Sequence, residues 1–590
     1  MGSERLAIDA EPGQPGALDD DEIDRLRARA SDDLAGSAAR RGVELLADLA
    51  ERTRGVDDEQ FCRVVTELLD AVGDLGDLDR QQQVVALAVE ATARAEGVTH
   101  ATGALVKAMT ARIATARGDR EASERAVSEA LAAIDGHEVD ARSRVALSLS
   151  LHRATNGVGD RAQAERFVAM ARDAARSAED HRLELRVEVA AALDALDAGR
   201  RPGLMRALAR IDDLRRFVTS PVALLAARSV ENSLAVLEGR YDSAATGLAD
   251  LDDLAEEAGV DSPVVWRQFA MLGLDTADLA TFLPTILAQS DSFPQSATLH
   301  ALAALTHLRA GDASAARRIV RGLAASDFGD LGAGGPAPVT GAILAQTVHE
   351  LGDADLAEPL LVALAPFGDR CVVDVTGSAI WLGSLDHHRG LLASLAGRHE
   401  EAIRLLDRAA EVHEHMRSRP WSVRTALAGA LARERAAGSR TRDETATDLR
   451  RWAAERCSEL GMRQPPEPRS DATAERTLLW RTQSDHWEIG APDGPIHVAD
   501  RVGLWYLGRL LEAPGVEISA TDLDRARHPS NGRGEAQSRV NVTKAIRSAI
   551  ALVGEHDEEL GAHLSTSIRT GARCRYEPGP LRVSWTVGLG

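Results

Sequence analysis

The chain has 590 residues, enough for several domains, and its formal net charge of -22 argues against a nucleic-acid-binding surface that covers the whole molecule. Aromatic residues make up only 3% of the sequence, which favours helices packed through small and aliphatic side chains over strands. The four cysteines show no C-x-x-C spacing, which indicates a reducing compartment and neither a disulfide framework nor a zinc site.

The N-terminal segment is rich in acidic residues, proline and glycine. It lacks the basic start and apolar centre of a signal peptide, so we expect residues 1–20 to be a disordered acidic lead-in. Further along the chain, no apolar run reaches the ~20 residues that a membrane-spanning helix needs. These features predict a cytoplasmic protein that does not contact a membrane.

Residues 21–461 contain a recurring pattern in which glycine, four further residues and alanine precede an apolar helix. Clear copies begin at Gly159, Gly239, Gly311, Gly352 and Gly397, and looser copies begin at Gly118 and Gly199. Glycine permits a tight turn with positive φ, and alanine lets the next helix approach its neighbour closely. Most successive copies are 40 or 41 residues apart. The pattern resembles tetratricopeptide (TPR) repeats in a longer form and predicts an α-solenoid.

Some side chains of this region are candidates for a binding site. Trp381 and Trp421 are candidates for an effector or partner surface, because solenoids bind along their concave face, with packing between repeats as the alternative. Asp386–His388 and His413–His415 carry metal-ligand side chains, but adjacent helical residues point about 100° apart and do not converge on one ion. The sequence therefore predicts no catalytic residue, no metal and no cofactor.

A change in composition separates the helical region from the C-terminus. Residues 462–476 are rich in proline and poor in apolar residues, which predicts a linker. Half of the eight tryptophans lie after residue 477. We expect two strands within residues 486–499, a helix over 501–512, a short helix over 521–527 and an amphipathic helix that begins near 538. Two further strands are expected on either side of a turn at 577–580.

The amphipathic helix carries cations and no carboxylate from residue 537 to residue 554. Residues 525–590 hold ten Lys or Arg and six Asp or Glu, although the whole chain is acidic. A cationic helix followed by a cationic hairpin is typical of a winged helix, in which the helix enters the major groove and the wing reaches the backbone. The candidate DNA-binding residues are Arg539, Asn541, Thr543, Lys544, Arg547, Arg573 and Arg575.

The order of a strand pair, LWYLGRLLEAPG, ISATDL, SRVNVTKAIRSAI and SIRTGARCRY resembles the winged helix of OmpR-type bacterial activators. More closely, it resembles the C-terminal part of large actinobacterial ATPase/LuxR-like transcriptional regulators. Within residues 120–465, the segments HEHMRSRPWSVRTALAGAL and AAERCSELGM extend this resemblance. Those regulators carry an ATPase upstream, whereas this chain has no G-x-x-x-x-G-K-[ST] loop, so nucleotide-driven switching does not carry over.

The resemblance implies a mainly α fold: a TPR-like α-solenoid over residues 21–461, followed by a small α/β winged-helix domain over residues 477–590. It implies a non-enzymatic transcriptional regulator. Residues 477–590 would bind double-stranded DNA, and the solenoid would take a protein or small-molecule effector, with a homodimer as one assembly. The alternative is a non-enzymatic TPR scaffold whose winged-helix domain binds protein instead of DNA.

Overall fold

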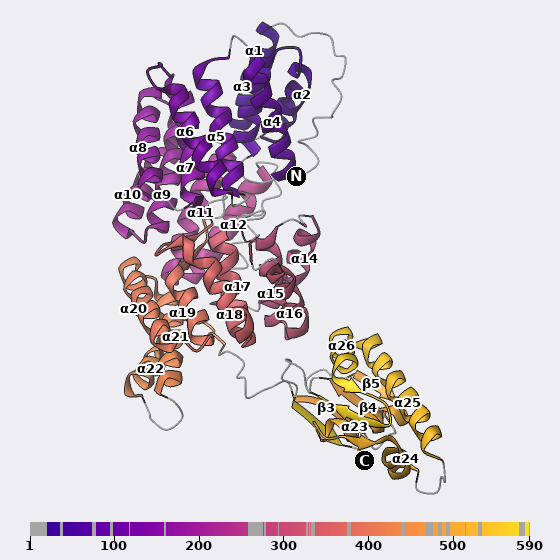
Figure 1. Cartoon of the computed structure of the whole chain (residues 1–590). Coiled ribbons are helices and arrows are strands. Elements are labelled where there is room, and N and C mark those ends of the chain that lie inside the picture. Colours follow the sequence, from indigo (N-terminus) through magenta and orange to yellow (C-terminus); the bar gives the residue numbers. More distant parts are fainter. Residues whose placement is uncertain are drawn as a thin grey trace. The chain divides into compact units, whose positions relative to one another are not determined.

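The chain separates into two compact units, Met1–Pro468 (the helical unit) and Arg469–Gly590 (the C-terminal unit), shown in Figure 1. The computed structural model describes residues 20–588 except 36–38, 73–77, 95–97, 117–118, 159–160, 258–274, 277–278, 293, 295, 326–327, 330, 332–336, 375–378, 438–442, 467–475, 482–485, 491–495, 514, 529–533 and 578–583. Most of the expected lead-in and linker lies outside the described residues.

Helices that follow one another in chain order form the helical unit. The α-helices are α1 (Asp20–Ala35), α2 (Ala39–Thr53), α3 (Asp58–Val72), α4 (Leu78–Arg94), α5 (His100–Ala116), α6 (Arg120–Ile134), α7 (Ala141–Val158), α8 (Arg161–Ala178), α9 (His181–Asp197), α10 (Arg201–Leu214), α11 (Pro221–Glu238), α12 (Tyr241–Glu257), α14 (Leu283–Ser292), α15 (Ala297–Arg309), α16 (Ala313–Ala324), α17 (Ala337–Leu351), α18 (Ala354–Leu364), α19 (Leu385–Leu395), α20 (His399–Met416), α21 (Arg419–Ala437) and α22 (Glu444–Leu460). Short 3-10 helices are η1 (Arg215–Phe217), η2 (Leu279–Phe282) and η3 (Ala365–Phe367).

Glycine ends the first helix of several of these pairs. The repeat glycines with φ between 63° and 92° are Gly199, Gly239, Gly311, Gly352 and Gly397. At Gly239, its own N–H donates to the Val236 carbonyl (3.0 Å) and the Arg240 N–H donates to the Ala235 carbonyl (2.8 Å). This pair of hydrogen bonds ends a helix at a residue in the left-handed conformation, which costs glycine little. Gly118 and Gly159 lie outside the described residues.

The alanines of the pattern lie where helices touch. In the five clear copies the alanine side chain is at most 1% exposed; these residues are Ala164, Ala244, Ala316, Ala357 and Ala402. Each hairpin leaves an apolar face that the next hairpin covers, so consecutive pairs stack into a helical-repeat arrangement. The mainly α prediction is confirmed for the described residues, which are helical over most of their length.

A small sheet interrupts the helices, where the sequence predicted almost no strand. Strands β1 (Cys371–Val373) and β2 (Trp381–Ser384) pair antiparallel, with Cys371 opposite Ser384. Gly383 in β2 has φ of 77°, and a Cβ there would lie 2.8 Å from the Trp421 ring. These strands have only three and four residues, all buried, so they are too short for a period-two pattern to reveal them in the sequence.

The C-terminal unit combines strands and helices. Its elements are β3 (Arg476–Arg481), β4 (His486–Gly490), β5 (Ile496–Ala499), α23 (Val502–Leu511), β6 (Ile518–Ser519), α24 (Ala520–Arg527), α25 (Glu535–His556), α26 (Glu558–Ser567), β7 (Ile568–Arg569), β8 (Arg573–Tyr576) and β9 (Ser584–Gly588). The expected strand pair and the helices at 501–512, 521–527 and from 538 onward correspond to β4, β5, α23, α24 and α25.

Residues 578–580 of the predicted turn lie outside the described residues, and the strands expected to pair on either side of it, β8 and β9, pair with other strands. Strand β8 pairs antiparallel with β6 and β7, so the hairpin turn falls at 570–572. Strand β9 instead pairs in parallel with β3, which completes a four-stranded sheet of order β5-β4-β3-β9. Trp585 and Val587 of β9 pack against the core of the C-terminal unit, and this burial explains why the strand joins that sheet.

Two further observations bear on function. No described helix is both long and apolar enough to cross a membrane. All four cysteines (Cys62, Cys371, Cys457 and Cys574) are buried free thiols.

Candidate nucleic-acid interface

One face of α25 is fixed in the core of the C-terminal unit. Val542, Ile546, Ala549 and Val553 are at most 2% exposed, and they follow the spacing of three and four residues that gives one apolar stripe. These side chains pack in the cluster that also contains Trp487, which is fully buried. The opposite face of α25 is therefore held toward solvent.

Two neighbouring helices fix the position of α25. A Cβ at Gly503 of α23 would come within 2.7 Å of the Ala545 carbonyl carbon, so glycine lets the two helices cross in close contact. Asp524 of α24 is 3% exposed and accepts hydrogen bonds from the Tyr506 hydroxyl (3.1 Å) and the Ser538 hydroxyl (2.8 Å). This buried carboxylate ties the first turns of α25 to α23 and α24.

Three cations project from α25 into solvent. Arg539, Lys544 and Arg547 are exposed, and none of their side chains forms an ion pair or hydrogen bond with the part of the chain that the structure describes. At about 100° per residue, Lys544 and Arg547 lie opposite the buried stripe and Arg539 lies on its flank. The helix carries carboxylates only near its ends, at Glu535 and Glu555. A polyanion can therefore reach these cations without displacing a carboxylate from them.

The two polar residues expected beside these cations are less accessible. Asn541 and Thr543 are half-buried, and Asn541 Oδ1 accepts a hydrogen bond from the Gln537 side chain at 3.0 Å. The structure thus brings the five predicted helix residues onto one helix, with Arg539, Lys544 and Arg547 the most exposed.

The arginines of the β7–β8 hairpin differ from those of α25, because each lies beside a carboxylate. Arg573 lies 3.7 Å from Glu517, and Arg569 lies 3.3 Å from Glu577. Arg575 also pairs with Glu577. Ion pairs at the protein surface contribute about 0–1 kcal/mol to the free energy of folding, so a phosphate can compete with the carboxylates for these guanidinium groups. The hairpin nevertheless offers less free positive charge than α25.

Sequence reasoning missed Val540. Its side chain is 56% exposed, between Arg539 and Lys544 on the outward side of α25. An exposed valine among cations offers an apolar contact, such as a methyl group of a base or an aliphatic side chain of a protein. In the sequence, Val540 falls about half a helical turn away from the apolar stripe of α25, and this position indicates that its side chain is exposed.

Comparisons with known proteins add no family: no protein-family model matches the chain, and no curated protein matches it.

The two tryptophans expected at an effector surface lie in the core of the helical unit. Trp381 and Trp421 are 4% and 7% exposed, and their rings meet edge to face with centroids 6.4 Å apart. The Trp381 indole N–H donates to the Leu196 carbonyl at 3.1 Å, and His413 packs against both rings. Both indoles are thus almost wholly covered by other residues of the helical unit.

Buried histidines surround these rings. The His387 Nδ1 lies 2.9 Å from the Thr425 hydroxyl, and the His388 Nε2 donates to the Leu382 carbonyl at 2.8 Å. Burial lowers the pKa of His388 to about 4 and of His413 to about 3, and it lowers the pKa of His387 well below its usual value. These imidazoles are neutral at pH 7. Among the described residues, no group of three or more metal-ligating side chains is placed to hold a metal ion.

Proposed function

We propose that the chain is a transcriptional regulator whose C-terminal unit binds double-stranded DNA as a winged helix. Helix α25 enters the major groove, and the β7–β8 hairpin acts as the wing against the phosphate backbone. The helical unit is a TPR-like solenoid that serves as a sensor or interaction module and carries no enzymatic activity.

The order of elements supports this assignment. In the C-terminal unit a sheet precedes three helices, α23, α24 and α25, and a hairpin follows after α26. Strand β6 lies between the first two helices and pairs with the hairpin strand β8, which holds the hairpin at one end of the helices. A helix turned outward beside such a hairpin is the arrangement that reads DNA in winged helices.

The observation that carries the proposal is the unpaired cationic face of α25. In a chain of net charge -22, Arg539, Lys544 and Arg547 project from one helix without carboxylate partners among the described residues. Three exposed cations on one helix repel one another, and a nearby anion relieves this repulsion. DNA phosphates supply such an anion, and an arginine can also donate two hydrogen bonds to the edge of one guanine.

Val540 favours the alternative, in which the same face binds protein. An apolar side chain 56% exposed at the centre of the face is typical of the anchor that a protein partner buries. In that case the cations would surround the anchor as a polar rim.

DNA titrations across a salt series separate the two functions. The full-length chain is titrated with a fluorescent 30-base-pair duplex and with pooled genomic fragments, between 50 and 200 mM salt. The triple variant Arg539→Ala, Lys544→Ala, Arg547→Ala should bind more weakly, and its slope of log affinity against log salt should fall by about 3 if all three cations contact phosphates. Loss of an arginine that reads a base should also relax selection among the genomic fragments.

A charge-matched control removes three exposed arginines of the helical unit. Arg120→Ala, Arg125→Ala and Arg451→Ala also remove three positive charges, and these side chains are at least 60% exposed on α6 and α22. This control should keep the salt slope of the unchanged protein. If the α25 variant retains both slope and affinity while its fold is intact, α25 does not contact DNA and the protein-binding alternative stands.

A further inference from the structure

A cleft in the helical unit is lined by every second helix of the row. Its volume is about 890 Å³, and its lining comes mainly from α1, α3, α5, α7, α9 and α11. Lining positions recur every 40 residues, as in Thr102, Arg142, Arg182 and Val222. Because equivalent positions of stacked repeats face the same side, the cleft is the inner face of the repeats. Helix α1 also packs against α11, so the row of helices curves around it.

The cleft is cationic although the chain is acidic. Its charged lining consists of Arg27, Arg63, Arg142, Arg153, Arg182, Arg186, Asp24, Glu67 and Asp140. The carboxylates are already engaged: Asp24 and Glu67 pair with Arg27. Asp140 accepts a hydrogen bond from the Ser143 backbone N–H at 3.0 Å, which caps α7. The lining thus holds six arginines against three carboxylates, and Arg63 pairs with Glu59, which lies outside the lining.

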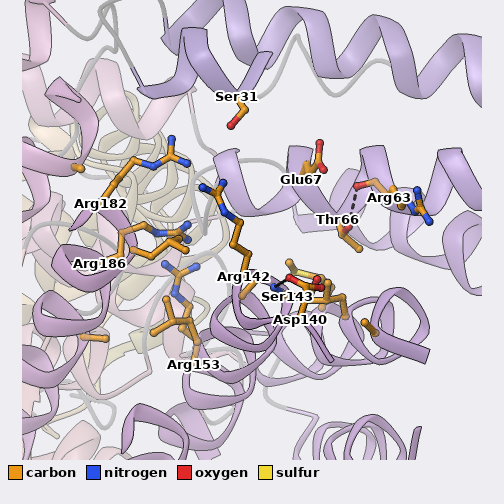
Figure 2. Close-up of a pocket in the computed structure, with 18 of the residues that line it drawn as sticks. Ser31, Arg63, Thr66, Glu67, Asp140, Arg142, Ser143, Arg153, Arg182 and Arg186 are labelled. Atoms are coloured by element: carbon orange, nitrogen blue, oxygen red, sulfur yellow. Dashed lines mark hydrogen bonds between the residues drawn. The ribbon is translucent and has the colours of Figure 1, made fainter. Parts of the chain in front are cut away.

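Four of the six lining arginines lie on α7 and α9. Figure 2 shows Arg142, Arg153, Arg182 and Arg186 directed into the same side of the cleft. Positions four and eleven residues apart share a helix face, so each pair of arginines projects from one stripe of its helix. Arg142 also lies 3.0 Å from Asp180, which caps α9.

Arg153 is the least compensated of these cations. It is half-buried, and its guanidinium group forms no ion pair or hydrogen bond with any residue that the structure describes. Leu149, one turn earlier on α7, and Leu193 of α9 also line the cleft, and both are buried. A guanidinium partly removed from water beside aliphatic side chains is costly unless an anion joins it.

The rest of the lining selects the body of that anion. Aliphatic side chains continue from the arginines along the cleft, among them Ala146, Leu149, Val189, Leu193 and Ala223. None of the described lining residues is Phe, Tyr or Trp, so the apolar part of the lining is aliphatic. The volume lies in the range of small-molecule sites.

We propose that this cleft binds an amphipathic organic anion, a carboxylate or phosphate carried on an aliphatic body. The anionic group contacts Arg153 and Arg186, and the aliphatic body lies along the side chains of α7 and α9. This site belongs to the helical unit, so the proposal does not depend on DNA binding by the C-terminal unit.

Calorimetric titration of the full-length chain tests the proposal with four probes. Decanoate and decyl phosphate should bind, and comparison of the two identifies the preferred head group. Decyltrimethylammonium has the same chain with the opposite charge and should not bind. Inorganic phosphate has the charge without the chain and should bind at least about tenfold more weakly than decyl phosphate, because it buries no apolar surface.

Variants then locate the site. Arg153→Gln with Arg186→Gln should weaken binding of the better anion about tenfold or more, since two charge-assisted hydrogen bonds are lost. The matched control, Arg144→Gln on α7 with Arg206→Gln on α10, changes exposed arginines outside the cleft and should leave affinity within about twofold. Arg186→Lys keeps the charge and should bind more tightly than Arg186→Gln. Circular dichroism confirms that each variant is folded.

Several results would overturn the proposal. They are equal binding of the ammonium probe, no binding of either anion at millimolar concentration, or unchanged affinity of the Arg153/Arg186 variant. A glutamate-rich peptide that binds more tightly than both anions and displaces them would assign the cleft to a protein partner instead.

Discussion

The crossing of α25 and α26 offers a sharp test of the C-terminal unit, because two glycines meet there asymmetrically. A Cβ at Gly561 would overlap the Gly554 Cα and lie 2.8 Å from the Gly554 nitrogen, and neither backbone atom can turn aside. A Cβ at Gly554 would meet only the Gly561 Cα, at 3.6 Å, an ordinary van der Waals distance. The same substitution at the two positions should therefore have opposite effects.

The magnitudes follow from two opposing contributions. Replacing glycine by alanine within a helix stabilises it by up to about 1 kcal/mol. Forcing a methyl group into a closed contact costs about 1–3 kcal/mol. Gly561→Ala should then destabilise the C-terminal unit by up to about 2 kcal/mol, whereas Gly554→Ala should be neutral or stabilising by up to about 1 kcal/mol.

Hydrogen exchange of the full-length chain, followed peptide by peptide in increasing urea, gives the opening free energy of α25 and α26 separately from the helical unit. Because α26 leads directly into β7, Gly561→Ala should also move the hairpin relative to α25 and weaken DNA binding more than Gly554→Ala. Equal stability of the two variants would show that the helices do not cross as closely as described.

Two further predictions concern the helical unit. Ala402→Leu should destabilise it by about 1–3 kcal/mol, because Ala402 is fully buried on α20. Ala410→Leu, on the exposed side of the same helix, should change stability by less than about 0.5 kcal/mol. Urea titrations compare the two variants, and equal effects would refute the repeat register. As pH falls below about 6.5, the unfolded chain protonates histidines that burial keeps neutral in the fold, with pKa values of about 3 for His413 and about 4 for His388. Their contribution to stability is thus complete above pH 6.5 and is lost toward pH 4, at about 1 kcal/mol per pH unit for each histidine. His413→Gln should flatten the decline of melting temperature between pH 7.5 and 5, and an unchanged decline would contradict this reasoning.

Local patterns predicted much of the fold, because they depend on neighbouring residues. The spacing of Val542, Ile546 and Val553 predicted which face of α25 is buried, and all three are fully buried. The repeat glycines predicted the turns, since few other residues adopt positive φ at low cost.

Contacts between distant segments could not be read in the same way. Nothing near Asp524 indicates that it receives hydrogen bonds from two other helices. The pairing of β9 with β3 joins residues more than 100 positions apart, so the nearby β8 was the natural but wrong partner. Arg142 and Arg182 are exactly one repeat of 40 residues apart, a spacing visible in the sequence once the inner face of the repeats is known.

The burial of every cysteine gives the protein its own set of conformational reporters. Burial raises the pKa of Cys62 to about 12 and raises the pKa values of the other three thiols, so thiolate is scarce and reagents reach it only when the surrounding structure opens. The four lie in α3, β1, α22 and β8. The rate at which each is alkylated thus measures opening at a different point along the chain, and Cys574 reports on the hairpin without any introduced label.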